Sequence, residues 1–254
     1  MPWFTAVAPQ PRLRLQAGLG LLLALLLAWG GLGQVWAANY SDPAYLAAVS
    51  DAKYPTTSEI SHDLTPIAAW NPDLVWEGVP GASRVKMVAL TRTYYDRSVG
   101  QDYILSFGEL WVTVAPELKQ FFQGDASGPS LARLEQLLGL PPESGYSRIV
   151  EFWVDPADLF RPTPDPEIDD TEAGLASPTG WRSLISKTYR DWFAATWASR
   201  FETATPYPWT QLGYTYDWGS SDHMGLSEYV IKKGSTVGVA GVWDPLAYFS
   251  PWPQ

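Results

Sequence analysis

An acidic segment holds the residues whose types and spacing first suggest chemistry. It places five carboxylates within eight residues, and prolines stiffen the chain around them. Carboxylates held this close repel one another, and a calcium ion would relieve the repulsion because it binds about six to eight oxygen ligands. The EF-hand spacing is absent, so a solvated acidic loop stays open beside a calcium site. The candidate ligands are Asp165, Glu167, Asp169, Asp170 and Glu172.

Aromatic rings are concentrated in residues 207–218. If residues 212–218 are extended, Leu212 and the rings at every second position after it share one face. Rings on an exposed strand would stack on sugars, with Asp217 or Gln211 binding hydroxyls, whereas rings in a core would bury about 150–250 Å² each. Both interpretations remain open. The candidate ligand-binding residues are Tyr207, Trp209, Tyr214, Tyr216, Asp217 and Trp218.

Catalytic motifs are scarce. His62 and His223 are the two histidines, and neither belongs to HExxH; the chain also lacks GxSxG and the phosphate-binding loops GxxxxGKS and GxGxxG. Glycoside hydrolysis needs two carboxyl groups about 5–10 Å apart, and the sequence does not reveal which acids meet. The acids in or beside expected strands are Glu109, Glu151, Asp217, Glu228 and Asp244.

Composition narrows the class of protein. The chain has 254 residues, 46% hydrophobic, with 14 Trp and a formal net charge of −10. This is globular composition, and the negative charge disfavours nucleic acid as a partner. Cysteine is absent, which excludes disulfides, thiolate metal sites and a lipid-modified N-terminal cysteine.

Residues 1–37 resemble an export signal. Arg12 and Arg14 precede an apolar run over residues 19–27, and Val35-Trp36-Ala37 fits the small-x-small rule of signal peptidase. We expect the general secretion route and a periplasmic or extracellular protein. An uncleaved anchor is the alternative, and no later stretch is apolar enough to span a membrane. Residues 38–254 would then form a single domain, with an acidic, proline-rich loop over 155–178.

Hydrophobic periodicity predicts an α+β domain with a mixed or antiparallel sheet and a few packed helices. Strands and helices do not alternate regularly, which argues against a doubly wound parallel sheet. The last two strands are expected to pair as a hairpin across residues 233–235. We predict strands over 74–76, 84–94, 110–114, 149–154, 226–232 and 236–243, and helices over 45–49, from 116, over 130–138 and over 181–201.

Four segments together resemble a group of exported bacterial proteins with no assigned function. They are LWVTVAPELKQFF, LARLEQLLGLPP, FWVDPADLFRPTPDPEIDD and YPWTQLGYTYDWG with the following GLSEYVIKKGS, and they lie within residues 74–235. The resemblance implies cysteines near the acidic loop in some relatives, where Thr163 and Thr171 stand here. It transfers no catalytic residue.

The leading hypothesis is a non-catalytic exported binding protein at the cell envelope, for a small ligand or a glycan. One alternative is a glycan-active hydrolase with paired carboxylates. Another is a structural or assembly protein that binds an envelope protein. Whether the protein is an enzyme is left open, calcium is the one cofactor considered, and a membrane span is expected only if the signal is uncleaved.

Overall fold

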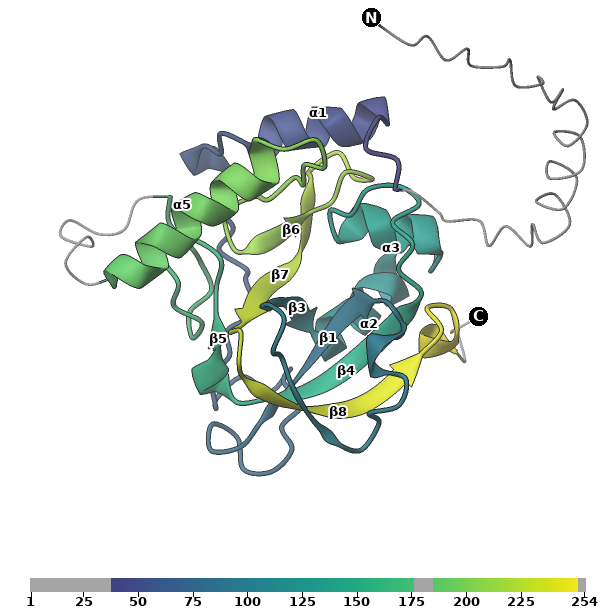
Figure 1. Cartoon of the computed structure of the whole chain (residues 1–254), viewed down its shortest axis with the longest axis vertical. Coiled ribbons are helices and arrows are strands. Elements are labelled where there is room, and N and C mark those ends of the chain that lie inside the picture. The colour runs from purple at the N-terminus through teal and green to yellow at the C-terminus, as the bar shows by residue number, and fades with distance from the viewer. Residues whose placement is uncertain (1–37, 176–184, 251–254) are drawn as a thin grey trace, which may run out of the picture. The chain divides into compact units, whose positions relative to one another are not determined.

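Eight antiparallel strands form one curved sheet in the computed structural model, which describes residues 38–175 and 185–250 (Figure 1). The strand order is β2-β8-β4-β1-β3-β7-β5, and β6 pairs with β7 outside this path. The described residues form one α+β domain, as the sequence predicts. The strands are β1 (Val85–Thr91), β2 (Asp102–Ile104), β3 (Leu110–Val114), β4 (Arg148–Val154), β5 (Leu159–Phe160), β6 (Tyr214–Tyr216), β7 (Met224–Ile231) and β8 (Thr236–Trp243).

The helices begin where the sequence supplies capping residues. Ser130 caps α3 through the amide of Arg133, and Gly139 follows the helix with a φ of +63° that suits glycine. Ser186 caps α5, which therefore begins at Lys187 and is shorter than predicted; the helix start expected near residue 177 lies outside the described residues. The α-helices are α1 (Pro43–Ala52), α2 (Ala115–Gly124), α3 (Leu131–Leu137) and α5 (Lys187–Phe201), and single 3-10 turns span Thr57–Glu59, Thr93–Tyr95, Pro156–Asp158 and Ala247–Phe249.

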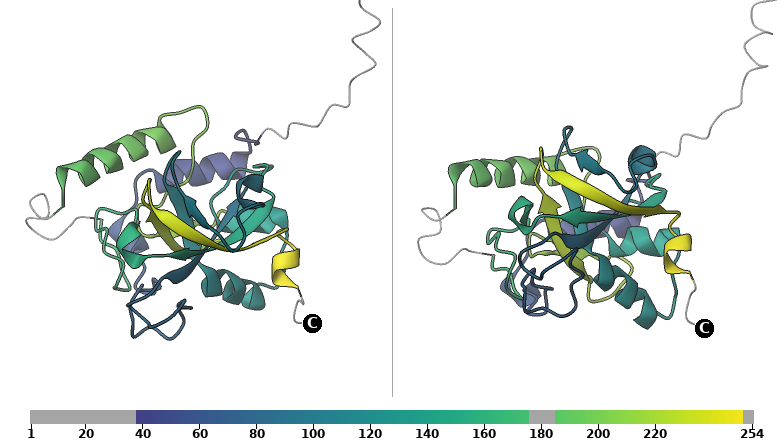
Figure 2. Two further views of the ribbon diagram at one scale, coloured as in Figure 1. Left: turned by 60° about the horizontal axis from the view of Figure 1, so that its bottom comes forward. Right: turned by 90° about the horizontal axis from the view of Figure 1, so that it is seen from below.

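The sheet has a hydrophobic cluster on each face. Figure 2 shows the curvature of the sheet from two further sides. Alternate residues of five strands, such as Val85 and Met87 of β1, meet in the larger cluster. Val88 of the same strand points to the opposite face, where it packs with Leu118 of α2 and Leu134 of α3. Among the described residues, no helix is both long and apolar enough to cross a membrane.

The predicted hairpin is wrong, although both of its strands exist. β7 pairs with β3, β5 and β6, whereas β8 pairs with β4 and β2. The backbone of Leu105, just after β2, bonds to Gly234 and Ser235 in the turn, and the amide of Lys232 donates to the carbonyl of Asp158 instead of to β8. The segment expected as a strand over 74–76 makes an isolated bridge, from Trp76 to Val85.

The neighbouring strands β1 and β3 separate along most of their length. Only Met87 and Val88 of β1 have partners on β3, namely Val114 and Thr113. Beyond them, β1 continues along β4 over its whole length, while residues 110–113 of β3 stay paired with β7. The parting leaves an opening in the sheet, and the candidate site lies there.

Candidate functional site

A pocket of about 710 Å³ occupies the opening between β1 and β3. Consecutive residues of both strands line it, 88–91 on one side and 110–113 on the other. Consecutive strand residues point to opposite faces, so they line one cavity only where the two strands have parted. Its volume falls in the range of small-molecule sites, about 300–1,000 Å³.

Nine aromatic side chains line the pocket. Tyr95 and Tyr103 lie edge to face with centroids 4.9 Å apart, and Trp111 and Trp209 do the same at 5.9 Å. Phe107 stands in the loop before β3 and is 94% exposed, which places it at the rim. The lining rings are Tyr94, Tyr95, Tyr103, Phe107, Trp111, Tyr146, Tyr207, Trp209 and Tyr216.

Glu228 of β7 contributes a carboxyl group to this wall. Burial raises its pKa from 4.5 to about 8, and the positive charge of Arg200 opposes the rise. The carboxyl makes no hydrogen bond or ion pair with any described residue, although its side chain is only partly exposed. Thr113 is its direct partner across the β3–β7 ladder, and the buried Thr113 Oγ1 also lacks a hydrogen-bond partner among the described residues.

Arg200 of α5 is the cation of the pocket wall. Its guanidinium carbon lies 4.8 Å from the ring centroid of Trp111 and 5.1 Å from that of Tyr207. This stacking holds the side chain in place by cation–π attraction. No carboxylate in the described part of the chain forms an ion pair with Arg200.

The structure divides the predicted aromatic residues between pocket and core. Tyr207, Trp209 and Tyr216 line the pocket, but Trp209 is 4% exposed and its Nε1 donates to the carbonyl of Pro162. Tyr214 and Trp218 lie away from the pocket wall, and each donates a hydrogen bond to a backbone carbonyl. Residues 207–218 therefore present no continuous exposed face of rings.

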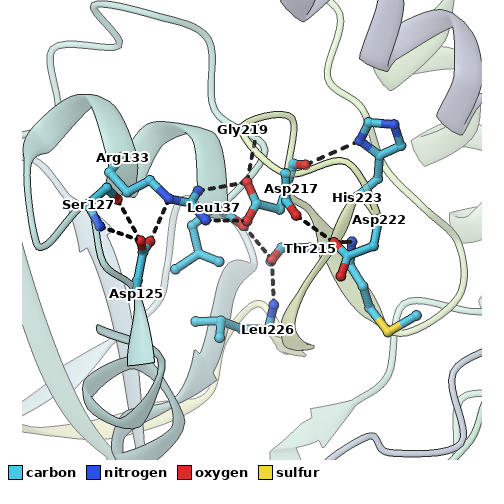
Figure 3. A network of polar contacts seen from close by, with 12 residues as sticks. Asp125, Ser127, Arg133, Leu137, Thr215, Asp217, Gly219, Asp222, His223 and Leu226 are labelled. Atoms are coloured by element: carbon cyan, nitrogen blue, oxygen red, sulfur yellow. Dashed lines mark hydrogen bonds and ion pairs between the residues drawn. The ribbon is translucent and has the colours of Figure 1, made fainter. Parts of the chain in front are cut away.

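Asp217, predicted as a ligand-binding residue, forms a buried ion pair within the protein. Its carboxylate accepts two hydrogen bonds from Arg133 of α3, at 2.7 and 2.6 Å, and Arg133 also donates to Asp125 at 2.7 Å (Figure 3). The Asp217 side chain is 1% exposed. Paired in this way, it is not available to a ligand.

The same network fixes one wall of the pocket. Thr215 Oγ1 donates to the carbonyl of Leu137 and accepts from the amide of Leu226, which joins α3, β6 and β7 (Figure 3). A Cβ at Gly225 would lie 2.8 Å from the Leu137 carbonyl oxygen, so close packing requires glycine there. Residues 138–140, which follow α3 and line the pocket, are held against β6 by these contacts.

The acidic segment spreads its side chains over several partners. Arg161, fully buried, pairs with Asp170 at 2.5 Å, and Glu172 contacts His62 at 2.6 Å. Burial raises the pKa of Asp165, and the neighbouring Asp165 charge raises that of Glu167. Across residues 38–175 and 185–250, no three acidic or histidine side chains are grouped so that they could hold a metal ion.

The carboxylates considered for hydrolysis do not all meet. Glu151 lies near Lys86 and Lys119 and accepts from the Tyr248 hydroxyl, and Asp244 pairs with Arg148. Glu109 lines the same pocket as Glu228. The two histidines are both exposed, as expected, with His223 stacked on Tyr216 at 4.9 Å.

Sequence reasoning found Glu228 but not its surroundings. It missed Trp111, Thr113 and Arg200, because an apolar strand and an amphipathic helix give no local sign that they line a cavity. The one available signal was an acid inside a strand of apolar residues, where a charge is costly unless it is paired.

Comparison with known proteins adds no relative. No protein-family model, curated protein or solved structure matches the chain.

Proposed function

We propose that this protein is an exported, non-catalytic binding protein that holds a small organic ligand in the pocket between β1 and β3. The ligand would carry at least one ring or another apolar group, because nine aromatic and several aliphatic side chains line the pocket. A long polysaccharide fits less well, since the aromatic segment 207–218 offers no continuous exposed face.

One observation carries the proposal: the Glu228 carboxyl group lines an aromatic pocket without a protein partner among the described residues. Removing a carboxyl from water without a hydrogen bond destabilises the folded state. Residues held in such a destabilising state cluster at functional sites, where a ligand supplies the missing partner.

The pocket supports binding better than glycoside hydrolysis. Glu109 directly precedes β3, four positions before Thr113, and Thr113 is the ladder partner of Glu228. Four residues of extended chain separate the backbones of Glu109 and Thr113 by about 13 Å, and the Glu109 carboxyl accepts a hydrogen bond from Trp192 Nε1. Asp217, Glu151 and Asp244 are already paired with cations.

Export remains part of the proposal on sequence grounds. The basic start, apolar run and small-x-small site of residues 1–37 support it, as does the resemblance to exported proteins over residues 74–235. Fractionating cells that produce the full chain, with mass determination of the product, would test it. A full-length protein in the cytosol would contradict it.

Ligand binding is tested by titrating the purified protein with a collection of ring-containing amines, acids and neutral compounds. Binding should change the fluorescence of Trp111 and Trp209 and raise the melting temperature, since a ligand at 100 times its Kd adds about 2.7 kcal/mol to stability. Release of reducing ends from glycans, assayed in parallel, would instead support the hydrolase.

Two variants locate the binding. Ser106→Trp places a large ring in the exposed loop that lines the pocket and is expected to abolish binding. Ser221→Trp makes the same change at an exposed position outside the pocket and should bind normally. If no ring-containing compound binds the native protein, the proposal fails.

A further inference from the structure

An acidic and a basic side chain line the pocket without forming an ion pair with each other. The Glu228 carboxyl and the Arg200 guanidinium both belong to its wall, and neither forms an ion pair or a side-chain hydrogen bond with a described residue. Some other shielded charges of the protein are paired with an opposite charge: Arg133 with Asp217, Arg161 with Asp170, and Glu151 with two lysines. Glu135 and Glu117 are shielded without a cation, and each accepts hydrogen bonds from a serine. Glu228 and Arg200 have neither kind of partner among the described residues.

The ladder and the ring contacts fix each group to its own part of the wall. Trp111 pairs with Val230 across the β3–β7 ladder, so Glu228 is its diagonal neighbour on the same face. Arg200 stacks on the Trp111 ring at 4.8 Å and on Tyr207 at 5.1 Å. The guanidinium is thus tied to one aromatic wall, and the carboxyl is fixed beside Thr113 on the sheet.

We propose that the pocket takes a zwitterionic ligand, in which an ammonium group binds Glu228 and a carboxylate binds Arg200. The inference rests on the proposed function of this pocket and specifies the chemistry of its ligand. An α-amino acid with a large apolar side chain has this chemistry: two opposite charges on a short scaffold and a group that packs on rings. Guanidinium binds carboxylate through two parallel hydrogen bonds, and aromatic rings attract ammonium groups.

Thr113 completes the ammonium end of the site. Its buried hydroxyl has no partner among the described residues and lies directly opposite Glu228. A hydroxyl can accept a hydrogen bond from an ammonium group that the carboxylate also holds. One ligand cation would therefore satisfy both unpartnered groups.

The arrangement couples binding to a proton. Burial keeps Glu228 protonated in the empty pocket near neutral pH, because its pKa is raised to about 8, and Arg200 is the charged group that acts on it. A bound ammonium favours the carboxylate, so binding releases a proton. Affinity should then rise with pH, approaching tenfold per unit below about pH 8.

The experiment compares four probes that share a phenyl ring: L-phenylalanine, phenethylamine, 3-phenylpropionate and 2-phenylethanol. Calorimetric titration between about pH 6 and pH 8, in buffers of different ionisation enthalpy, gives affinity and proton release together. We expect L-phenylalanine to bind tightest, with proton release, and each singly charged probe to bind about 10–100-fold more weakly.

Charge-neutralising variants assign each end. Glu228→Gln should weaken the binding of phenethylamine and L-phenylalanine about 10–100-fold and leave the binding of 3-phenylpropionate unchanged. Arg200→Gln should weaken the binding of 3-phenylpropionate and leave the binding of phenethylamine unchanged. The matched controls are Glu202→Gln and Arg97→Gln, which change exposed charges outside the pocket wall and should alter no affinity.

The outcomes separate this inference from the function it rests on. If 2-phenylethanol or either singly charged probe binds as tightly as L-phenylalanine, the pocket binds ring compounds but the zwitterion is wrong. If affinity for L-phenylalanine falls as pH rises, the ammonium is not at Glu228 and the inference is overturned. If no ring compound of any charge binds, the inference and the proposed function fail together.

Discussion

Glu228 lies directly opposite Thr113 across the β3–β7 ladder, and neither side chain has a hydrogen-bond partner among the described residues. Opposed residues on neighbouring strands hold their Cβ atoms about 5 Å apart on the same face. The pair therefore places a carboxyl and a hydroxyl at one point of the pocket wall. This polar point could orient a ligand that the rings alone would only surround.

Stability should depend on pH through Glu228. Its pKa is about 8 in the folded protein and 4.5 in its unperturbed state. Between these values the folded state keeps a proton that the unfolded chain has released, so the free energy of unfolding falls as pH rises, by at most about 1.4 kcal/mol per unit. Above about pH 8 the decline ends because both states are ionised.

Urea unfolding of the native protein and of Glu228→Gln across this range isolates the effect. Contributions from other titrating groups cancel in the difference between the two proteins. We expect Glu228→Gln to gain stability relative to the native protein as pH rises. A difference that does not change with pH would mean that the carboxyl is ionised in the fold at neutral pH.

Loss of the Arg133–Asp217 pair should destabilise the fold strongly. Arg133→Met leaves a carboxylate that is 1% exposed without its two charge-assisted hydrogen bonds, which costs about 3–5 kcal/mol. Lys187→Met removes the exposed pair with Asp191 and should cost less than about 0.5 kcal/mol. Similar losses in urea unfolding for both variants would refute the structural role of Asp217.

Gly225→Ala should destabilise the domain and loosen the pocket wall. The added Cβ would overlap Thr215 and approach the Leu137 carbonyl oxygen to 2.8 Å, so backbone must move. Gly124→Ala, at the last residue of α2, meets nothing within 4 Å and serves as the control. Thermal unfolding should show a clear loss for the first variant and none for the second.

Trp209 is expected to contribute to stability as a core residue. It is 4% exposed, and its ring packs on Trp111 and on Phe193 at 4.9 Å. Trp209→Ala should cost about 3–5 kcal/mol in urea unfolding. Trp70→Ala, at a tryptophan that is 69% exposed, should cost far less. An equal, small cost for both would place Trp209 at the surface.

Calcium is expected to leave the melting temperature unchanged. Asp170 and Glu172 of the acidic segment already contact Arg161 and His62, so they would have to leave these partners to bind a cation. Scanning calorimetry with calcium and with a chelator tests this. A saturable rise in melting temperature that Asp165→Asn removes would restore the calcium hypothesis.

Local signals in the sequence located most of the elements. Ser130, the leucines after it and Gly139 define α3 because capping, periodicity and left-handed backbone act within a few residues. The strand over residues 110–114 was predicted at its observed bounds for the same reason. The short strands β2 and β5 were not predicted, since two or three residues carry no periodic signal, whereas β6 lies within the segment considered as extended over residues 212–218.

Local sequence signals could not predict which strands pair with each other. The last two strands are joined by a short turn that is typical of a hairpin, yet β7 and β8 pair with other strands. Alternation shows which side of a strand is apolar but not which strand lies beside it. The ion pair of Asp217 with Arg133 could not be predicted for the same reason, because Arg133 lies 84 residues away in the chain.

The sequence by itself determined the α+β class, the absence of disulfides, most element positions and Glu228 as an acid in an apolar strand. Only the tertiary structure decided that β1 and β3 part, that rings and Arg200 line the opening, and that Glu228 stays unpaired there. The physical reason is that propensity, capping and alternation act between near neighbours. A pocket and a raised pKa arise from burial among residues that are distant in the chain.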